Sequence, residues 1–167
     1  MQEIKKIDMA FQQLEDALAA YFNGRYHSAL VLAAAAEQLF AGYMHLHELE
    51  PAFTSMRKII VKIANGLKSA SVMTEKRTTQ DIGDLLNRAY NHSHHAGKTE
   101  LELRINPKFE AQETIDRTIS NFDALSSRYV LPILPLAQKF IEESAGEIAL
   151  EDDIEDVLSL VVNTGGA

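Results

Sequence analysis

One segment constrains the fold more than any other: SALVLAAAAEQLFAGYM, residues 28–44, is apolar on nearly all sides and rich in alanine. A helix that is apolar all round is buried by its neighbours, and alanine side chains let those neighbours approach closely. Asn23 and Gly24 precede this segment and Pro51 follows it, and these residue types end helices. The sequence therefore predicts a central helix over residues 26–46.

Other segments carry apolar residues at steps of three and four, the spacing of an amphipathic helix. Thr78 and Asp81 form an approximate capping box at the start of one of them. Only residues 101–107 alternate, briefly, as a strand does. We therefore expect an all-α protein, a compact up-and-down bundle of about five core helices in residues 1–141, with an acidic helix in residues 142–167. The expected outer helices cover residues 4–21, 53–67, 78–97, 110–129, 136–141 and 151–162.

Acidic residues are concentrated at one end of the chain. The formal net charge is −8, from 16 Lys and Arg against 24 Asp and Glu. Eight of the acids follow residue 141 and no Lys or Arg does, so residues 1–141 are neutral. Residues 51–80 are locally basic. The acidic segment either aids solubility or lies over this basic segment and competes with phosphate.

Composition excludes several classes of protein. The chain has no cysteine, which excludes disulfides, thiolate metal sites and cysteine nucleophiles. The first residues lack the apolar run of a secretory signal. The longest apolar stretch, residues 29–36, is far shorter than the roughly 18 residues that cross a membrane. We expect a soluble, cytoplasmic protein that has no membrane partner.

The segment NHSHH, residues 91–95, holds three of the six histidines. On a helix Arg88, His92 and His95 form one strip, and Tyr90 and His94 lie on another. This polar group is either a solvated helix end or a functional site. A metal site is a further alternative, in which His92 and His95 meet the end of the central helix, which carries His45, His47 and Glu48.

Two other groups of residues are candidates for binding. Glu37 projects onto the apolar side of the central helix, so we expect it to be buried and to have a partner. That partner is either a structural Lys, Arg or Tyr, or Arg88 and the histidine cluster. Three cations of the basic segment either contact phosphates or face solvent: Arg57, Lys58 and Lys62.

Two segments together resemble HEPN domains (higher eukaryotes and prokaryotes nucleotide-binding). AYFNGRYHSALVLAAAAEQLFAGYM, residues 20–44, resembles their opening helix pair, and LLNRAYNHSHHAG, residues 85–97, resembles their later helix with its signature of Arg, four to six residues and His. The likeness covers roughly residues 10–130. It implies a compact helical bundle, commonly dimeric, of the kind found in bacterial toxin–antitoxin and defence systems.

Many HEPN domains are metal-independent ribonucleases, in which Arg and His of two protomers face each other across the dimer interface. The resemblance assigns these roles to Arg88, which steadies phosphate, and to His94 or His95 as the acid or base, with Asn91 and Glu37 orienting them. It implies no cofactor. It implies a homodimer, and RNA, a nucleotide or an antitoxin-like protein as the partner.

The departures from the HEPN pattern favour a member that binds without cutting. The family has a polar residue directly after its Arg, whereas Arg88 is followed by Ala89. If Asn91 is taken as that polar residue, Tyr90 stands at the Arg position and His95 at the His position. We therefore favour a non-catalytic module that binds through Arg88, Tyr90, Asn91 and His92, with the nuclease and the metal-binding bundle as alternatives.

Overall fold

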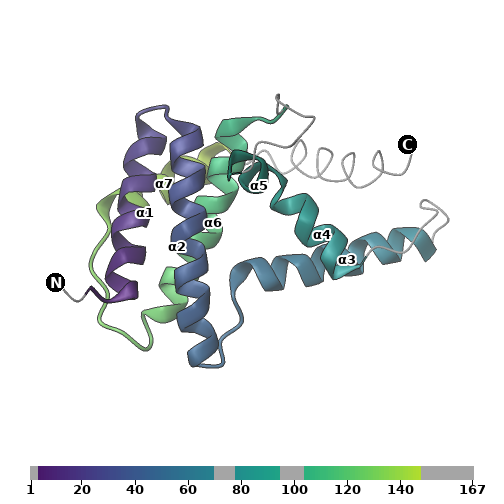
Figure 1. Cartoon of the computed structure of the whole chain (residues 1–167), viewed down its shortest axis with the longest axis horizontal. Helices are drawn as coiled ribbons and strands as arrows, with labels where there is room; N and C mark the ends of the chain where they lie inside the picture. The colour runs from purple at the N-terminus through teal and green to yellow at the C-terminus, as the bar shows by residue number, and fades with distance from the viewer. Residues whose placement is uncertain (1–3, 70–77, 95–103, 148–167) are drawn as a thin grey trace.

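The computed structural model of the chain describes residues 4–69, 78–94 and 104–147. Within these ranges the secondary structure is helical and no strand is formed, which confirms the predicted all-α class. Of the expected extended link, residues 104–106 are described and are irregular. The described helices are α1 (Lys6–Phe22), α2 (Tyr26–Leu46), α3 (Ala52–Ser69), α4 (Thr79–Leu86), α5 (Arg88–His94), α6 (Pro107–Leu125) and α7 (Pro135–Glu147) (Figure 1).

Helix α2 has the bounds that the sequence predicts, and it packs along both α1 and α6 (Figure 1). Ala29, Ala33 and Ala36 are completely buried along its length. The chain reverses between α1 and α2 at Gly24, whose φ of 71° lies in the left-handed region that glycine adopts without steric cost. Small side chains and a tight turn thus hold α1 and α2 together along their lengths.

Helix α2 is also long and apolar enough to cross a membrane, with a mean hydropathy of 1.3 over its best window. The central helix of a globular bundle meets the same criteria, because it too is apolar on most sides. Here the apolar surface of α2 contacts α1 and α6, and its sequence includes a buried carboxylate at Glu37.

The main hydrophobic core lies among α1, α2, α6 and α7. Phe11 of α1 packs edge-on against Phe122 of α6, with ring centroids 5.6 Å apart. Each large apolar side chain buried in this way contributes about 1.5–3 kcal/mol to folding. The largest apolar side chains that are almost completely buried are Leu14, Leu18, Leu30, Phe40, Ile82, Ile115, Leu125 and Phe140.

Helices α3 and α4, which we call the arm, project from the side of this bundle (Figure 1). The backbone N–H of Ala52, at the start of α3, donates a hydrogen bond of 2.8 Å to Oδ1 of the buried Asn121 in α6. Helix α4 packs on α3, and α5 returns the chain to α2. The arm is therefore attached at its base by α6 and at its end by α5.

The prediction that one face of α3 is core is wrong for its outer part. The spacing of three and four in residues 53–67 places Ile63 on the same face as Phe53, Met56, Ile60 and Leu67, and a shared apolar face is expected to be buried. Ile63 is nevertheless 52% exposed, and Ile59 is 56% exposed. The reason is the course of α3, which contacts α6 near its beginning and then leads away from the bundle (Figure 1). Helical periodicity identifies an apolar stripe, but it does not show which part of that stripe other helices cover.

The expected helix over residues 78–97 begins as predicted and is then interrupted. Thr78 and Asp81 form a complete capping box at the start of α4. Helix α4 ends at Leu86 and is capped by Asn87, whose N–H donates a hydrogen bond of 3.1 Å to the carbonyl oxygen of Gly83. Arg88 then begins the separate helix α5, so two helices stand within the range where the sequence predicts one.

Helix α7 extends further than the sequence predicts. The expected end was Ile141, but α7 continues to Glu147, and Ser144 is buried. The boundary placed after residue 141 therefore falls inside a helix. The acidic helix expected over residues 151–162 lies outside the described residues.

Candidate functional site

A buried ion pair joins α2 to α6. Arg117 Nε donates a hydrogen bond of 2.9 Å to Glu37 Oε1, and Arg117 Nη2 lies 3.3 Å from Glu37 Oε2. Only 8% of Glu37 and 9% of Arg117 is exposed. Arg117 Nη2 also lies 3.3 Å from the hydroxyl oxygen of Thr114. Both carboxylate oxygens are thus held by one guanidinium, which is the geometry of a strong charge-assisted pair.

The predicted burial of Glu37 is confirmed, and its partner is structural. Because Arg117 occupies both oxygens, the described contacts do not join Glu37 to Arg88, which stood as the alternative partner. Removing one member of such a pair leaves a buried charge without compensation and costs about 3–5 kcal/mol. Glu37 therefore fixes α6 against α2 through Arg117.

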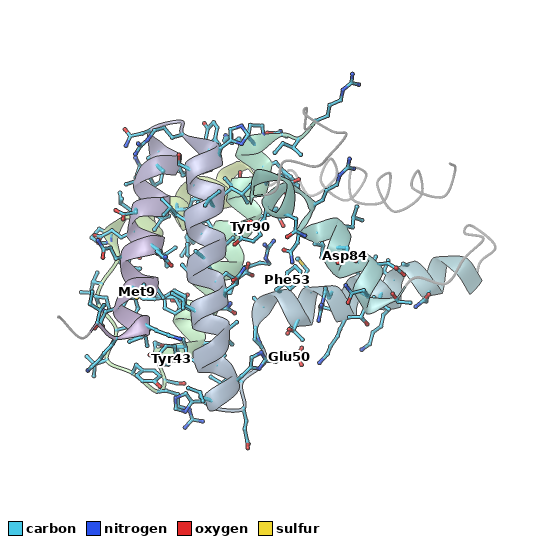
Figure 2. All side chains as sticks on the ribbon, in the orientation of Figure 1. Met9, Tyr43, Glu50, Phe53, Asp84 and Tyr90 are labelled. Carbon is cyan, nitrogen blue, oxygen red and sulfur yellow. The ribbon has the colours of Figure 1, made fainter. Side chains whose placement is uncertain are left out.

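The guanidinium of Arg117 also faces the base of the arm. Its Cζ lies 5.3 Å from the ring centroid of Phe53, in the first turn of α3. Arg57, one helical turn later, places its own Cζ 5.3 Å from the same centroid. Phe53 thus contacts one guanidinium from the bundle and one from the arm, and each contact is a favourable cation–π interaction. Figure 2 shows Phe53 and Tyr90 between α2 and the arm.

Arg57 is half-buried and does not simply face solvent. Its Nε is buried and has no hydrogen-bond partner within the described residues. Its side chain fits against α4 at Gly83, where an added Cβ would lie 3.1 Å from Arg57 Cδ and Nη1. The glycine therefore lets α4 pack on Arg57. A partly desolvated cation with a buried donor left over is suited to an anionic acceptor.

The two predicted lysines of α3 are both exposed. Lys58 pairs with Glu50, which also accepts a hydrogen bond of 2.7 Å from the Ser55 hydroxyl. The hydrogen bond from Lys58, followed by that from Ser55, lowers the pKa of Glu50. Lys62 forms no ion pair within the described residues, so its charge is directed to solvent.

Helix α5 carries the residues of the histidine segment. Arg88 and Asn91 are exposed, and Tyr90 is half-buried with its hydroxyl oxygen 3.4 Å from Gln38 Nε2. This contact links α5 to the residue that follows Glu37. The side chains of His92 and His94, and all of His95, lie outside the described residues. The predicted pairing of Arg88 with a histidine thus stays a prediction.

Two carboxyl groups of α6 lie close to the charge of Arg117. Burial raises the pKa of Glu110 and of Asp116 above their ordinary values, and the positive charge of Arg117 opposes this rise in both cases. Burial also raises the pKa of Asp123, further along the same helix. At Glu110 and Asp116 the effect of burial on the pKa is therefore larger than the effect of the Arg117 charge. Both carboxyl groups bind a proton more readily in the folded state than in the unfolded state.

The described side chains include no group of three or more His, Asp or Glu placed to hold a metal ion. Of the histidines considered for such a site, His45 is exposed. His47 Nε2 lies 2.7 Å from the Tyr129 hydroxyl, so it joins the end of α2 to the end of α6. The other two histidines of that prediction, His92 and His95, are not covered by the described side chains.

Sequence reasoning missed Arg117, which is the residue that organises this region. The sequence does contain a pattern that could have identified it. In α6, polar residues recur at the spacing i, i+3, i+4 and i+7 of one helix face, beside the apolar stripe that includes Ile115. All four members of the polar stripe are buried: Thr114, Arg117, Thr118 and Asn121. This stripe faces α2 and α3 rather than solvent.

Comparisons of the chain with family models, curated proteins and solved structures find no significant match.

Proposed function

We propose that the protein is a HEPN-like helical module that binds RNA through its phosphates and does not cleave it. Arg57 is the observation that carries this proposal, because its guanidinium is held in place by Phe53 and Gly83 while its buried Nε has no acceptor within the described residues. Carboxylate and phosphate oxygens are the acceptors that fit a guanidinium group, and RNA supplies phosphate oxygens.

Exposed cations on α3 and on α5 support RNA as the ligand. Lys62 on α3 and Arg88 on α5 are exposed and form no ion pair within the described part of the chain. Phosphate contacts supply most of the affinity in sequence-independent binding of nucleic acid. Single-stranded RNA also stacks its bases on aromatic and guanidinium planes, and Phe53 and Tyr90 are half-buried aromatic side chains beside the arm.

Two features favour binding without cleavage. Glu37, which the nuclease alternative uses to orient the catalytic residues, is fully engaged by Arg117. Arg88 is the first residue of a short helix and is followed by Ala89, which is buried and apolar. An active site requires catalytic groups held by supporting hydrogen bonds, and the described residues give Arg88 no such support.

The test of binding is fluorescence anisotropy of a labelled single-stranded RNA with the full chain at low salt. Lys62→Ala/Arg88→Ala should weaken binding by at least about tenfold, because two phosphate contacts are lost. The matched control, Lys5→Ala/Lys6→Ala, removes the same charge from exposed residues at the start of α1 and should change affinity little. Equal losses in the two variants, or no binding by the native chain, would overturn the proposal.

Cleavage is tested separately, by incubating the same RNA with the native chain in the presence of a chelator. We expect intact RNA on a gel with the native chain, with Arg88→Ala and with His94→Ala/His95→Ala. Cleavage by the native chain that both variants lose would establish the metal-independent ribonuclease instead. Nucleotides and a protein partner enter as competitors of the RNA in the binding assay.

The proposal includes a homodimer in the cytoplasm. A HEPN-like module is expected to expose one binding surface from each of two copies. Light scattering should then give twice the chain mass of 18.6 kDa. A monomer at micromolar concentration would contradict the dimer. RNA binding would still be decided separately, by the anisotropy measurements.

A further inference from the structure

The outer face of α3 combines apolar and basic groups in a narrow strip. Ile59 and Ile63, one helical turn apart, are 56% and 52% exposed. Lys58 and Lys62 precede them at the same spacing and are also exposed. We call these four residues the α3 strip.

Two large exposed isoleucines in adjacent turns of one helix form an apolar patch that a partner can cover. Covering them removes apolar surface from water, which favours binding at about 25 cal/mol per Å². A surface that fits the α3 strip must offer an apolar stripe, and it must place negative charge beside that stripe to meet the lysines.

One segment of this chain has that combination. In the helix that the sequence predicts over residues 151–162, Ile154, Val157, Leu158 and Val161 share one face at the spacing i, i+3, i+4 and i+7. Asp153 and Glu155 lie about 100° to either side of Ile154. Residues 148–167 contain five acids and no Lys or Arg. Their apolar stripe and their charge both complement the α3 strip.

The chain is also long enough to bring the two together. Helix α7 ends at Glu147, and residues 148–153 alone could span about 20 Å as an extended chain. Docking within one chain avoids the entropy cost of bringing two molecules together, because the linker keeps the segment at a high effective concentration.

We propose that residues 148–167 dock on the α3 strip of the same chain and compete there with phosphate. The docking rests on the described surface and on the sequence of the segment. The competition rests in addition on the proposed RNA binding, because Lys62 belongs to the α3 strip and is also a proposed phosphate contact. The two parts are tested separately, so that one can fail while the other stands.

Docking is tested without RNA, in the full chain, by paramagnetic relaxation enhancement. The chain has no cysteine, so Ser159→Cys takes a single spin label. The isoleucine methyl groups are isotopically labelled, and the variants Ile59→Val and Ile63→Val assign the methyl signals of these two residues. The spin label should broaden both of these signals. The methyl signal of Ile133, which is 91% exposed between α6 and α7, serves as the reference and should stay sharp.

The outcomes decide between one chain and two. Broadening of both signals that weakens at high salt is the expected result, because salt screens the lysine–acid attraction. A sample in which spin-labelled chains are mixed with isotope-labelled chains should show no broadening. Unbroadened signals in the first sample overturn the proposal, and so does broadening that appears equally in the mixed sample, since another copy would then cover the strip.

Competition is tested by RNA affinity. Asp153→Asn/Glu155→Gln removes the acids that flank the apolar stripe and should tighten RNA binding about fivefold at low salt, with no difference at high salt. Glu15→Gln/Asp16→Asn removes the same charge from exposed residues of α1 and should tighten it less than twofold. Equal effects of the two variants would overturn competition, whereas absent RNA binding would overturn the proposed function and leave the docking result unaffected.

Discussion

At the residue scale, the ion pair between Glu37 and Arg117 connects the bundle to the arm. The carboxylate holds the guanidinium at 2.9 Å, and the guanidinium lies 5.3 Å from the centre of Phe53. Phe53 in turn contacts Arg57, the residue that carries the proposed phosphate contact. A single buried carboxylate on α2 thus fixes a chain of contacts that ends near the surface.

This arrangement predicts a strongly coupled pair. Glu37→Leu and Arg117→Met should each destabilise the protein by about 3–5 kcal/mol, because each leaves a buried charge without its partner. The double variant should be more stable than either single variant. Urea unfolding of the four proteins measures the coupling, and a double variant whose loss equals the sum of the two single losses would contradict it.

Asp116 should make stability depend on pH. Its pKa is raised in the folded state by burial, from an ordinary value of 3.8. Between that value and the raised pKa, the folded state binds more protons than the unfolded state, so the free energy of unfolding falls as pH rises through this window. Asp116→Asn removes this dependence.

The measurement is a series of urea unfolding curves from pH 3 to pH 7 for the native chain and for Asp116→Asn. Relative to the native chain, the variant should gain stability as pH rises through the window above 3.8, and the difference should then stay constant. A variant that instead loses stability as pH rises would show that the attraction of Arg117 outweighs burial.

At the element scale, the helices could be predicted from the sequence, but the projection of the arm from the bundle could not. The bounds of α2 follow from an apolar segment with helix-ending residues on both sides. The capping box at Thr78 follows from a side chain that caps its own helix. The exposure of Ile63 depends on the direction in which α3 leaves the bundle. Arg117 was missed for a related reason, because a polar stripe looks the same in the sequence whether it faces solvent or a neighbouring helix.

The packing of α4 on α3 predicts that the effect of Gly83→Ala on stability depends on Arg57. Replacing an exposed helical glycine with alanine stabilises a helix by about 1 kcal/mol, and Gly66→Ala in α3 should show this gain because nothing lies within 4 Å of the added Cβ. Gly83→Ala should gain less, since its Cβ meets Arg57 at 3.1 Å.

Thermal or urea unfolding in two backgrounds separates the causes. In the Arg57→Ala background the obstacle is absent, and Gly83→Ala should recover the gain of about 1 kcal/mol that Gly66→Ala shows. If Gly83→Ala gains as much in the native background as in the Arg57→Ala background, then Arg57 does not limit the approach of α4 to α3.

At the scale of the whole molecule, charge is separated along the chain. Residues 1–141 are neutral, and the excess of eight acids follows them. An acidic isoelectric point of about 5.2 therefore does not describe the surfaces of α3 and α5, where Lys62 and Arg88 are exposed. We propose that RNA binds to this local surface and that the acidic segment covers part of it.

The most direct test of RNA binding is its salt dependence. The logarithm of the association constant should fall linearly with the logarithm of salt concentration, and each phosphate contact with a single strand contributes about 0.7 to the slope. Lys62→Ala/Arg88→Ala should make the slope shallower by about 1.4, and Lys5→Ala/Lys6→Ala should leave it unchanged. Equal slopes for the native chain and the Lys62/Arg88 variant would contradict the assignment of RNA phosphates to this surface.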